Sequence, residues 1–154
     1  MNKKLLVIPF LMFSVLFFSG CGVKSVEVKT SATKELKVND NKPKADKVQV
    51  FLFHATKRCA TCIAIGELSS KTVYEYFQPE LQAGKIESRE INIDLPENKE
   101  LAKKFQASGS ALFINAIYDG QDHITEDTRV WRLTKDDVQF KNYLREKINS
   151  LLGK

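Results

Sequence analysis

The feature that most restricts the fold of this chain is a short apolar run that stops just before two cysteines. Residues 47–53 read KVQVFLF, which is rich in valine and phenylalanine and typical of a strand buried on both faces. Cys59 and Cys62 follow, and across residues 60–82 apolar side chains recur close to helical spacing, with Pro79 marking a break or kink. The sequence therefore predicts a strand, a C-x-x-C pair and then a helix.

The rest of the chain continues this alternation of strand and helix patterns. We expect strands at 85–93, at 110–118 and within 123–133, and helices at 96–106 and 136–152. We expect Asp94 to be the N-cap of the helix at 96–106. Val138 is one of the apolar side chains that we expect on the buried face of the last helix. Asp119-Gly120 is a hairpin signal that joins the last two strands.

The order of these elements is βαβαββα, which predicts one α/β domain over residues 47–152. A right-handed crossover makes the first two strands parallel, and the hairpin makes the last two antiparallel. We therefore expect a four-stranded mixed sheet with helices on both faces. A domain of this size supports a core without metals or structural disulfides.

Residues 1–20 have the pattern of an export signal. Two lysines precede the apolar stretch 5–18, which is shorter than the ~20 residues of a spanning helix. The stretch ends FFSGCG, which resembles the lipobox of bacterial lipoproteins. The resemblance implies cleavage before Cys21, a lipid on its thiol and a domain anchored at the cell envelope, outside the cytoplasm. The alternative is an ordinary secretory signal in which Cys21 is a stray thiol.

The segment between the signal and the domain has the composition of a flexible tether. Residues 22–46 contain no aromatic side chain and are rich in lysine, serine, threonine, asparagine and aspartate. We assign residues 21–46 to a lipidated tether. From residue 48 onward the basic and acidic residues balance at 15 each. A neutral domain without a basic stripe has no electrostatic footprint for nucleic acid, so we expect no such partner.

The position of the two cysteines favours a redox pair. They lie where the first strand ends and a helix begins, and the free amide N–H groups of a helix N-terminus stabilise a thiolate. Lys57 and Arg58 add positive charge just before Cys59. We expect Cys59 to be the exposed attacking thiol with a lowered pKa, and Cys62, one turn on, to be the buried resolving thiol.

Three other interpretations of the cysteines remain open. A closed zinc site would need His54 and His123, the two histidines of the chain, to converge on both thiols. A two-coordinate site for Cu(I) or trivalent arsenic needs only the thiolates. The pair could also be two small buried side chains. A lone histidine at a strand end more often has a structural role than an acid–base role, and we assign His54 accordingly, as a supporting residue.

Residues 47–152 resemble the thioredoxin superfamily through the order of elements and the placed CATC motif. The stretches FHATKRCATC and SGSALFI are further similar to a small bacterial family called ArsF-type, whose members are named nitrophenyl compound nitroreductase subunits. The first resemblance implies thiol–disulfide exchange. The second implies a role in nitro-group reduction.

Two positions depart from the thioredoxin pattern. Ala111 stands where thioredoxins have a cis-proline beside the disulfide, and because a non-proline cis bond costs about 3–4 kcal/mol we expect a trans bond there. Counting back from Cys59, Phe53 stands where thioredoxins have a buried acid. The resemblance then implies a resolving step without a built-in base.

These observations together predict an envelope-anchored thiol–disulfide exchange protein. Its partners would be thiols or disulfides of envelope proteins and an envelope reductant or oxidant. The competing class is a non-catalytic thiol protein, either a carrier of Cu(I) or As(III) or an accessory subunit of a reductase. We expect no cofactor and no self-sufficient nitroreductase activity, because the chain shows no glycine-rich dinucleotide fingerprint and no further cysteines for an iron–sulfur cluster.

Overall fold

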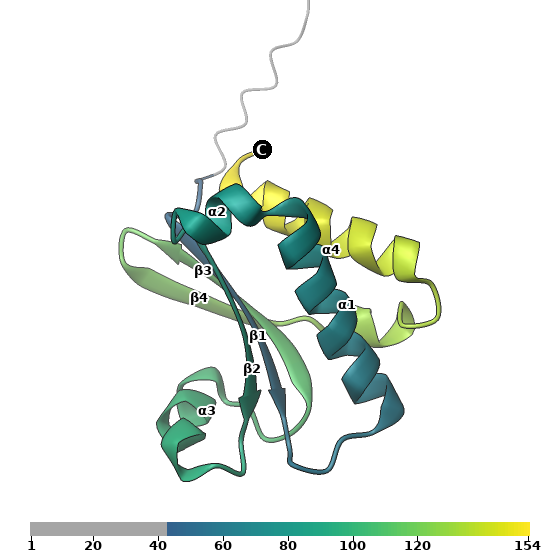
Figure 1. The fold of residues 1–154 in the computed structure, drawn as a ribbon. Helices are drawn as coiled ribbons and strands as arrows, with labels where there is room; N and C mark the ends of the chain where they lie inside the picture. The colour runs from purple at the N-terminus through teal and green to yellow at the C-terminus, as the bar shows by residue number, and fades with distance from the viewer. Residues whose placement is uncertain (1–42) are drawn as a thin grey trace, which may run out of the picture. The chain divides into compact units, whose positions relative to one another are not determined.

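The computed structural model describes residues 43–154, which form one α/β domain (Figure 1). Along the chain the elements are β1 (Lys47–His54), α1 (Ala60–Tyr76), α2 (Gln78–Gln82), β2 (Ile86–Asn92), the 3₁₀ turn η1 (Pro96–Asn98), α3 (Lys99–Phe105), β3 (Ala111–Tyr118), β4 (Gln121–Glu126), the 3₁₀ turn η2 (Thr128–Arg132) and α4 (Asp137–Leu152).

The four strands form one mixed sheet in the order β2-β1-β3-β4. β1 pairs in parallel with β2 and antiparallel with β3, and β3 pairs antiparallel with β4. β1 comes first in the sequence but lies inside the sheet. The connection through α1 and α2 leads from β1 to β2 on one side of β1, and the connection through α3 leads from β2 to β3 on the other side of β1. This is the thioredoxin-like arrangement, and the predicted fold class is confirmed.

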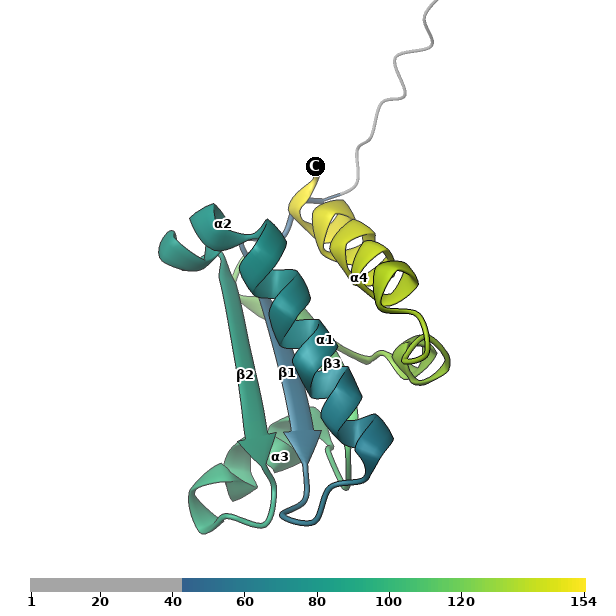
Figure 2. The same ribbon diagram turned by 45° about the vertical axis from the view of Figure 1, so that its right-hand side comes forward.

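Helices cover both faces of the sheet. α1 and α4 lie side by side on one face (Figure 2), where the β1 side chains Val48, Val50 and Leu52 enter the larger core. α3 covers part of the other face, where Phe51 and Phe53 meet its own apolar side chains. The alternation of side chains along β1 explains the two clusters, because successive residues of a strand point to opposite faces.

Several elements differ in detail from the sequence prediction. The predicted helix over residues 60–82 is divided at Phe77, and Pro79 lies in the first turn of α2, where its missing N–H does no harm. The predicted N-cap role of Asp94 is wrong, because Asn98 holds that position for α3 and Asp94 instead accepts a hydrogen bond from the Thr56 N–H at 2.7 Å.

Two further assignments also need correction. Val138 is 67% exposed, although helical spacing placed it in the buried face of the last helix. The folded domain begins before residue 47, because Ala45 is buried and its N–H donates to Leu151 O at 2.8 Å. Residues 45 and 46 therefore belong to the domain and not to the tether.

The predicted signal at residues 1–20, the lipidation site Cys21 and most of the tether lie outside the described residues. Among residues 43–154, no helix is long and apolar enough to cross a membrane.

Candidate functional site

The two cysteines lie at the point where the loop after β1 enters α1. Cys59 is the N-cap of α1, in an extended backbone conformation, and its Sγ accepts a hydrogen bond from the Cys62 N–H at 3.1 Å. The two cysteines form a disulfide, with their Cα atoms 5.1 Å apart. A cap bond of this kind satisfies one of the amide groups that a helix N-terminus leaves unpaired. This N–H therefore points at the sulfur that would carry the charge of a Cys59 thiolate, and donors at helix N-termini stabilise thiolates.

Solvent reaches the two cysteines unequally. Cys59 is exposed, whereas Cys62 is buried at 7% exposure. A disulfide partner approaching from solvent would therefore meet the sulfur of Cys59 first. The attacking and resolving roles assigned to the two thiols stay predictions, and this geometry agrees with them.

The two cationic side chains that precede Cys59 have different surroundings. Arg58 turns away from solvent, with Nη1 donating to Glu90 Oε2 at 2.7 Å and Nη2 donating to the carbonyl oxygen of Cys62 at 3.2 Å. Its charge is thus shared with a carboxylate. Lys57 is exposed and makes no ion pair or hydrogen bond within residues 43–154.

Glu90 is a site residue that the sequence analysis missed. In the register of the sheet it lies beside Leu52, on the face covered by α1. A signal was present in the sequence, because Glu90 has the strand parity of the buried Ile86, and a charged residue at such a position needs a partner. The identity of that partner, an arginine 32 residues earlier, was not available from the local pattern.

Gly66 is the second missed residue. A Cβ atom there would lie 2.7 Å from Arg58 Nη2, 2.7 Å from Leu52 Cδ2 and 2.9 Å from Glu90 Oε1. Glycine inside a helix costs about 1 kcal/mol relative to alanine. Its presence in α1 is explained by the close approach of these three side chains.

Phe53, which stands where thioredoxins have a buried acid, does not face α1. Phe53 is fully buried in the phenylalanine cluster under α3, on the face of the sheet away from α1. Its neighbour Leu52 faces α1 instead and comes close to Gly66.

His54 and Ala111 lie at neighbouring strand ends. The His54 ring Nδ1 lies 2.9 Å from the carbonyl oxygen of Ala55. The backbone carbonyl of His54 accepts from the Ile93 N–H, which ties the end of β1 to the residue after β2. Ala111 is paired with Phe53 and packs in the phenylalanine cluster. The expectation of a trans bond at Ala111 is confirmed, since residues 43–154 contain no cis peptide bond.

The loop that carries the cysteines is tied to the loop after β2. Thr56 donates its N–H to Asp94 Oδ2, and Asn92 Nδ2 donates to Thr56 Oγ1 at 3.1 Å. The bond from the Thr56 backbone holds the pKa of the Asp94 carboxyl below its usual range. Asp94, misassigned as a helix cap, is therefore a residue that positions the approach to Cys59.

No group of three or more histidine, cysteine, aspartate or glutamate side chains in the described part of the chain is arranged to hold a metal ion. The two histidines do not converge. His54 ends β1, whereas His123 is paired with Ala116, which is paired with Val48 near the start of β1. About six residues of strand, roughly 20 Å, separate the two positions along the sheet.

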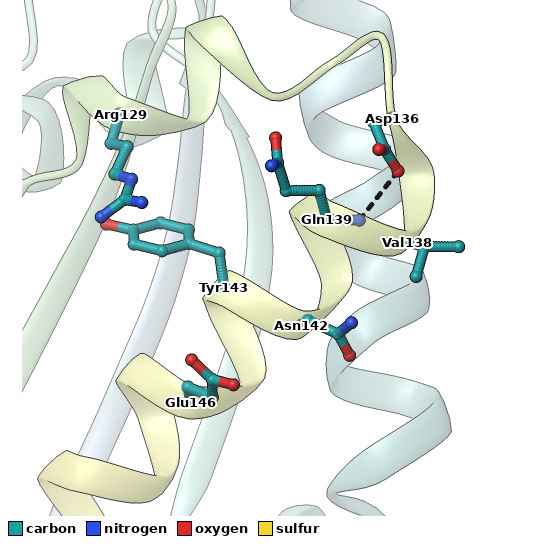
Figure 3. A pocket seen from close by; sticks show the side chains of 7 residues that line it. All are labelled: Arg129, Asp136, Val138, Gln139, Asn142, Tyr143 and Glu146. Atoms are coloured by element: carbon teal, nitrogen blue, oxygen red, sulfur yellow. Dashed lines mark hydrogen bonds between the residues drawn. The ribbon is translucent and has the colours of Figure 1, made fainter.

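A surface pocket lies elsewhere, between η2 and α4 (Figure 3). Arg129 stacks over the ring of Tyr143 with its Cζ 4.6 Å from the ring centroid. The remaining lining residues come from the beginning of α4 and its N-cap: Asp136, Val138, Gln139, Asn142 and Glu146. Neither cysteine lines this pocket.

No family model matches this chain, and no curated protein matches it. Solved structures do resemble it. An uncharacterized thioredoxin-like protein from Clostridium perfringens aligns with a TM-score of 0.46 at 14% identity, covering 78% of this chain and 90% of its own. A thioredoxin from Thermus thermophilus aligns with a TM-score of 0.41 at 14% identity, covering 68% and 76%. A malarial protein aligns with a TM-score of 0.39 at 17% identity, covering 63% and 96%.

Proposed function

We propose that this protein exchanges disulfides with other proteins through Cys59 and Cys62. The observation that carries the proposal is the asymmetry of the pair, with an exposed sulfur at the N-cap of α1 and a buried partner one turn on. The N-cap position supplies an amide donor for the thiolate, and burial of the second thiol protects it until the first has reacted.

The exchange reaction is balanced as follows. The Cys59 thiolate attacks one sulfur of a partner disulfide, which forms a mixed disulfide and releases the partner's other sulfur as a thiolate. Cys62, after losing its proton, attacks Cys59 Sγ and expels the second partner thiolate. The Cys59–Cys62 pair is oxidised by two electrons, and the partner disulfide is reduced to two thiols. The reverse sequence oxidises a partner dithiol.

The proposal places this chemistry in the cell envelope. The lipobox-like sequence before Cys21 supports a lipid anchor, with the domain outside the cytoplasm and its partners among envelope proteins and an envelope reductant or oxidant. The mass of the mature N-terminal peptide tests the anchor, and an unlipidated N-terminus at another residue would refute it.

A role in nitro-group reduction, if the ArsF-type resemblance carries one, belongs to this protein only as an accessory subunit. A dithiol delivers two electrons, whereas reduction of a nitro group takes several from a hydride or one-electron cofactor. We expect the purified chain, given nicotinamide cofactor, to leave a nitroaromatic compound unreduced. Flavin binding together with such activity would contradict this assignment.

Trapping of a mixed disulfide tests the exchange function directly. In the full chain, Cys62→Ala leaves Cys59 unable to resolve, so adducts with envelope proteins should accumulate on non-reducing gels and disappear with dithiothreitol. Cys59→Ala is the matched control and should accumulate none, because Cys62 is buried and the proposed lipid occupies the sulfur of Cys21. If Cys62→Ala traps nothing while the unaltered protein binds Cu(I) or As(III) tightly, the carrier function replaces this proposal.

A further inference from the structure

We propose that Arg58 and Glu90 form a charge pair that sets the reduction potential of the Cys59–Cys62 disulfide. In this pair Arg58 favours the thiolates of the reduced form and Glu90 opposes them. The inference rests on the proposed function in that it takes the two cysteines to be a redox pair. It gives control of the reduction potential to one charged residue of β2 and one of the loop before α1, because the β1 residues on this face of the sheet are apolar.

The contacts of Arg58 connect the charge pair to the cysteines. Arg58 directly precedes Cys59, and its guanidinium spans from Glu90 Oε2 at 2.7 Å to the carbonyl oxygen of Cys62 at 3.2 Å. One side chain thus contacts a cysteine of the pair and a carboxylate on the adjoining strand. The Arg58 Nε is buried without a hydrogen-bond partner among residues 43–154, so part of the guanidinium is removed from solvent.

Gly66 shows that α1 leaves room for this pair. Atoms of both charged side chains lie within 3 Å of the position that a Cβ of Gly66 would occupy. Gly66 follows Cys62 by one helical turn and is on the same side of α1. The carboxylate of Glu90 therefore lies within about one turn of the resolving cysteine, although the Glu90 side chain is 38% exposed.

Solvent screens the two charges to different extents. The Arg58 side chain is 20% exposed, so its charge is screened less than that of a fully exposed side chain, whereas Glu90 is 38% exposed and lies at the surface. The other charged or titratable side chains of the surrounding loops are Lys57, His54 and Asp94, and they stay the same in every variant considered below. A substitution that neutralises Arg58 or Glu90 alone therefore changes the net charge near the cysteines by one unit.

The two halves of the pair should act in opposite directions. A change that stabilises the thiolate favours the reduced form and makes the disulfide more oxidising. Glu90→Gln leaves the Arg58 charge uncompensated, so the potential should become less negative. Arg58→Met leaves the Glu90 carboxylate unpaired, so the potential should become more negative. A purely structural clamp predicts a different result, because loosening the loop from either side would shift the potential in the same direction.

The test is the redox equilibrium of the full-length protein with reduced and oxidised glutathione at pH 7, measured by alkylation and mass shift. We expect each variant to change the equilibrium constant by about three- to tenfold, in opposite directions, which corresponds to about 15 to 30 mV. Arg58→Lys retains the charge and should stay close to the unaltered protein. Glu87→Gln is the matched control. Glu87 lies on β2, as Glu90 does, but on the opposite face of the sheet, where it is ion-paired with Lys47 of β1.

Shifts of Glu90→Gln and Arg58→Met in the same direction, or no larger than that of Glu87→Gln, would overturn the inference. Circular dichroism shows whether each variant is folded, and Glu90→Gln, the most conservative of them, keeps the sign of the shift measurable if Arg58→Met is unstable. The equilibrium with glutathione needs no protein partner. Failure to trap a partner with Cys62→Ala would therefore remove the proposed function without deciding this question, and opposite shifts would stand by themselves.

Discussion

Asp127 is a buried carboxylate that joins η2 to α4. At 2% exposure it accepts hydrogen bonds from the Tyr143 hydroxyl at 2.9 and 3.0 Å, and its Oδ2 is ion-paired with Lys147 at 2.8 Å. Its Oδ1 also accepts from the Arg129 N–H, which caps the 3₁₀ turn. A buried aspartate persists in a core only when it is paired in this way.

The hydroxyl of Tyr143 should titrate last among the four tyrosines of the chain. Burial, followed by the hydrogen bond to Asp127, raises the pKa of Tyr143 from 10.0 to about 12. Because the folded-state pKa is the higher one, the contribution of this group to stability is complete below pH 10 and is lost as the pH rises toward 12. Tyr143→Phe should lower the unfolding free energy by about 1 kcal/mol at pH 7.

Tyrosinate absorbance across an alkaline titration checks the prediction for Tyr143. The unaltered protein should show a final step that Tyr143→Phe lacks. Tyr74→Phe serves as the control, since that ring is 55% exposed, and it should leave the last step in place. A last step unaffected by Tyr143→Phe would contradict the assignment.

Among the elements, the hairpin of β3 and β4 depends most on backbone conformation. β4 is an edge strand that pairs only with β3, and most of its side chains are exposed. The turn residues Asp119 and Gly120 have φ values of 49° and 74°, the left-handed region that a two-residue hairpin requires. Aspartate tolerates this region better than most residues, and glycine adopts it without steric cost.

Gly120→Ala should destabilise the protein by about 1–2 kcal/mol, because the added Cβ meets no neighbour within 4 Å and acts only through the strained φ. Gly109→Ala is the matched control, since its Cβ is equally unobstructed and its φ is not positive. It should be neutral or stabilising by up to about 1 kcal/mol. Urea denaturation measures both, and equal losses would show that the turn conformation is not the cause.

At the scale of the whole molecule, the residues before β1 connect the start and the end of the described chain. Asp46 donates its N–H to Ile117 O and accepts from the Asp119 N–H through Oδ2, both at 2.8 Å. Ala45 donates to Leu151 near the end of α4, and the stem of Lys44 lies over Gly153. This end of the domain is closed by residues that composition assigned to a linker.

A chain that begins at residue 47 should therefore be less stable than one that begins at residue 43. It loses three hydrogen bonds, each worth about 1 kcal/mol, so we expect the unfolding free energy to fall by about 2–3 kcal/mol. Asp46→Ala in the longer chain removes only the bond to Asp119 and should cost about 1 kcal/mol. Equal urea midpoints for the two chains would place the boundary at residue 47 after all.

The sequence predicted the features that depend on local periodicity. It did not predict the role of residues whose partner lies far away along the chain. The order of strands and helices, the hairpin and the last helix at residues 136–152 follow from local patterns, and all are present, with Asp136 as the N-cap of α4 and not its first residue. Asp94 looked like a helix cap because its true partner, Thr56, is 38 residues away. The pairing of Arg58 with Glu90 was invisible for the same reason, since no local rule brings a loop side chain under α1 to meet β2.

The central position of β1 has a consequence for the order in which the chain folds. The first strand to be synthesised has its nearer partner 38 residues later, at Val48 and Ile86, and its farther partner 70 residues later, at Lys47 and Ile117. Closing loops of this length gives the domain a high contact order and slows its folding. During that interval Cys62 is not yet buried. Before the domain folds, the two thiols are therefore more equally exposed to oxidants, and the inequality between them arises with the fold.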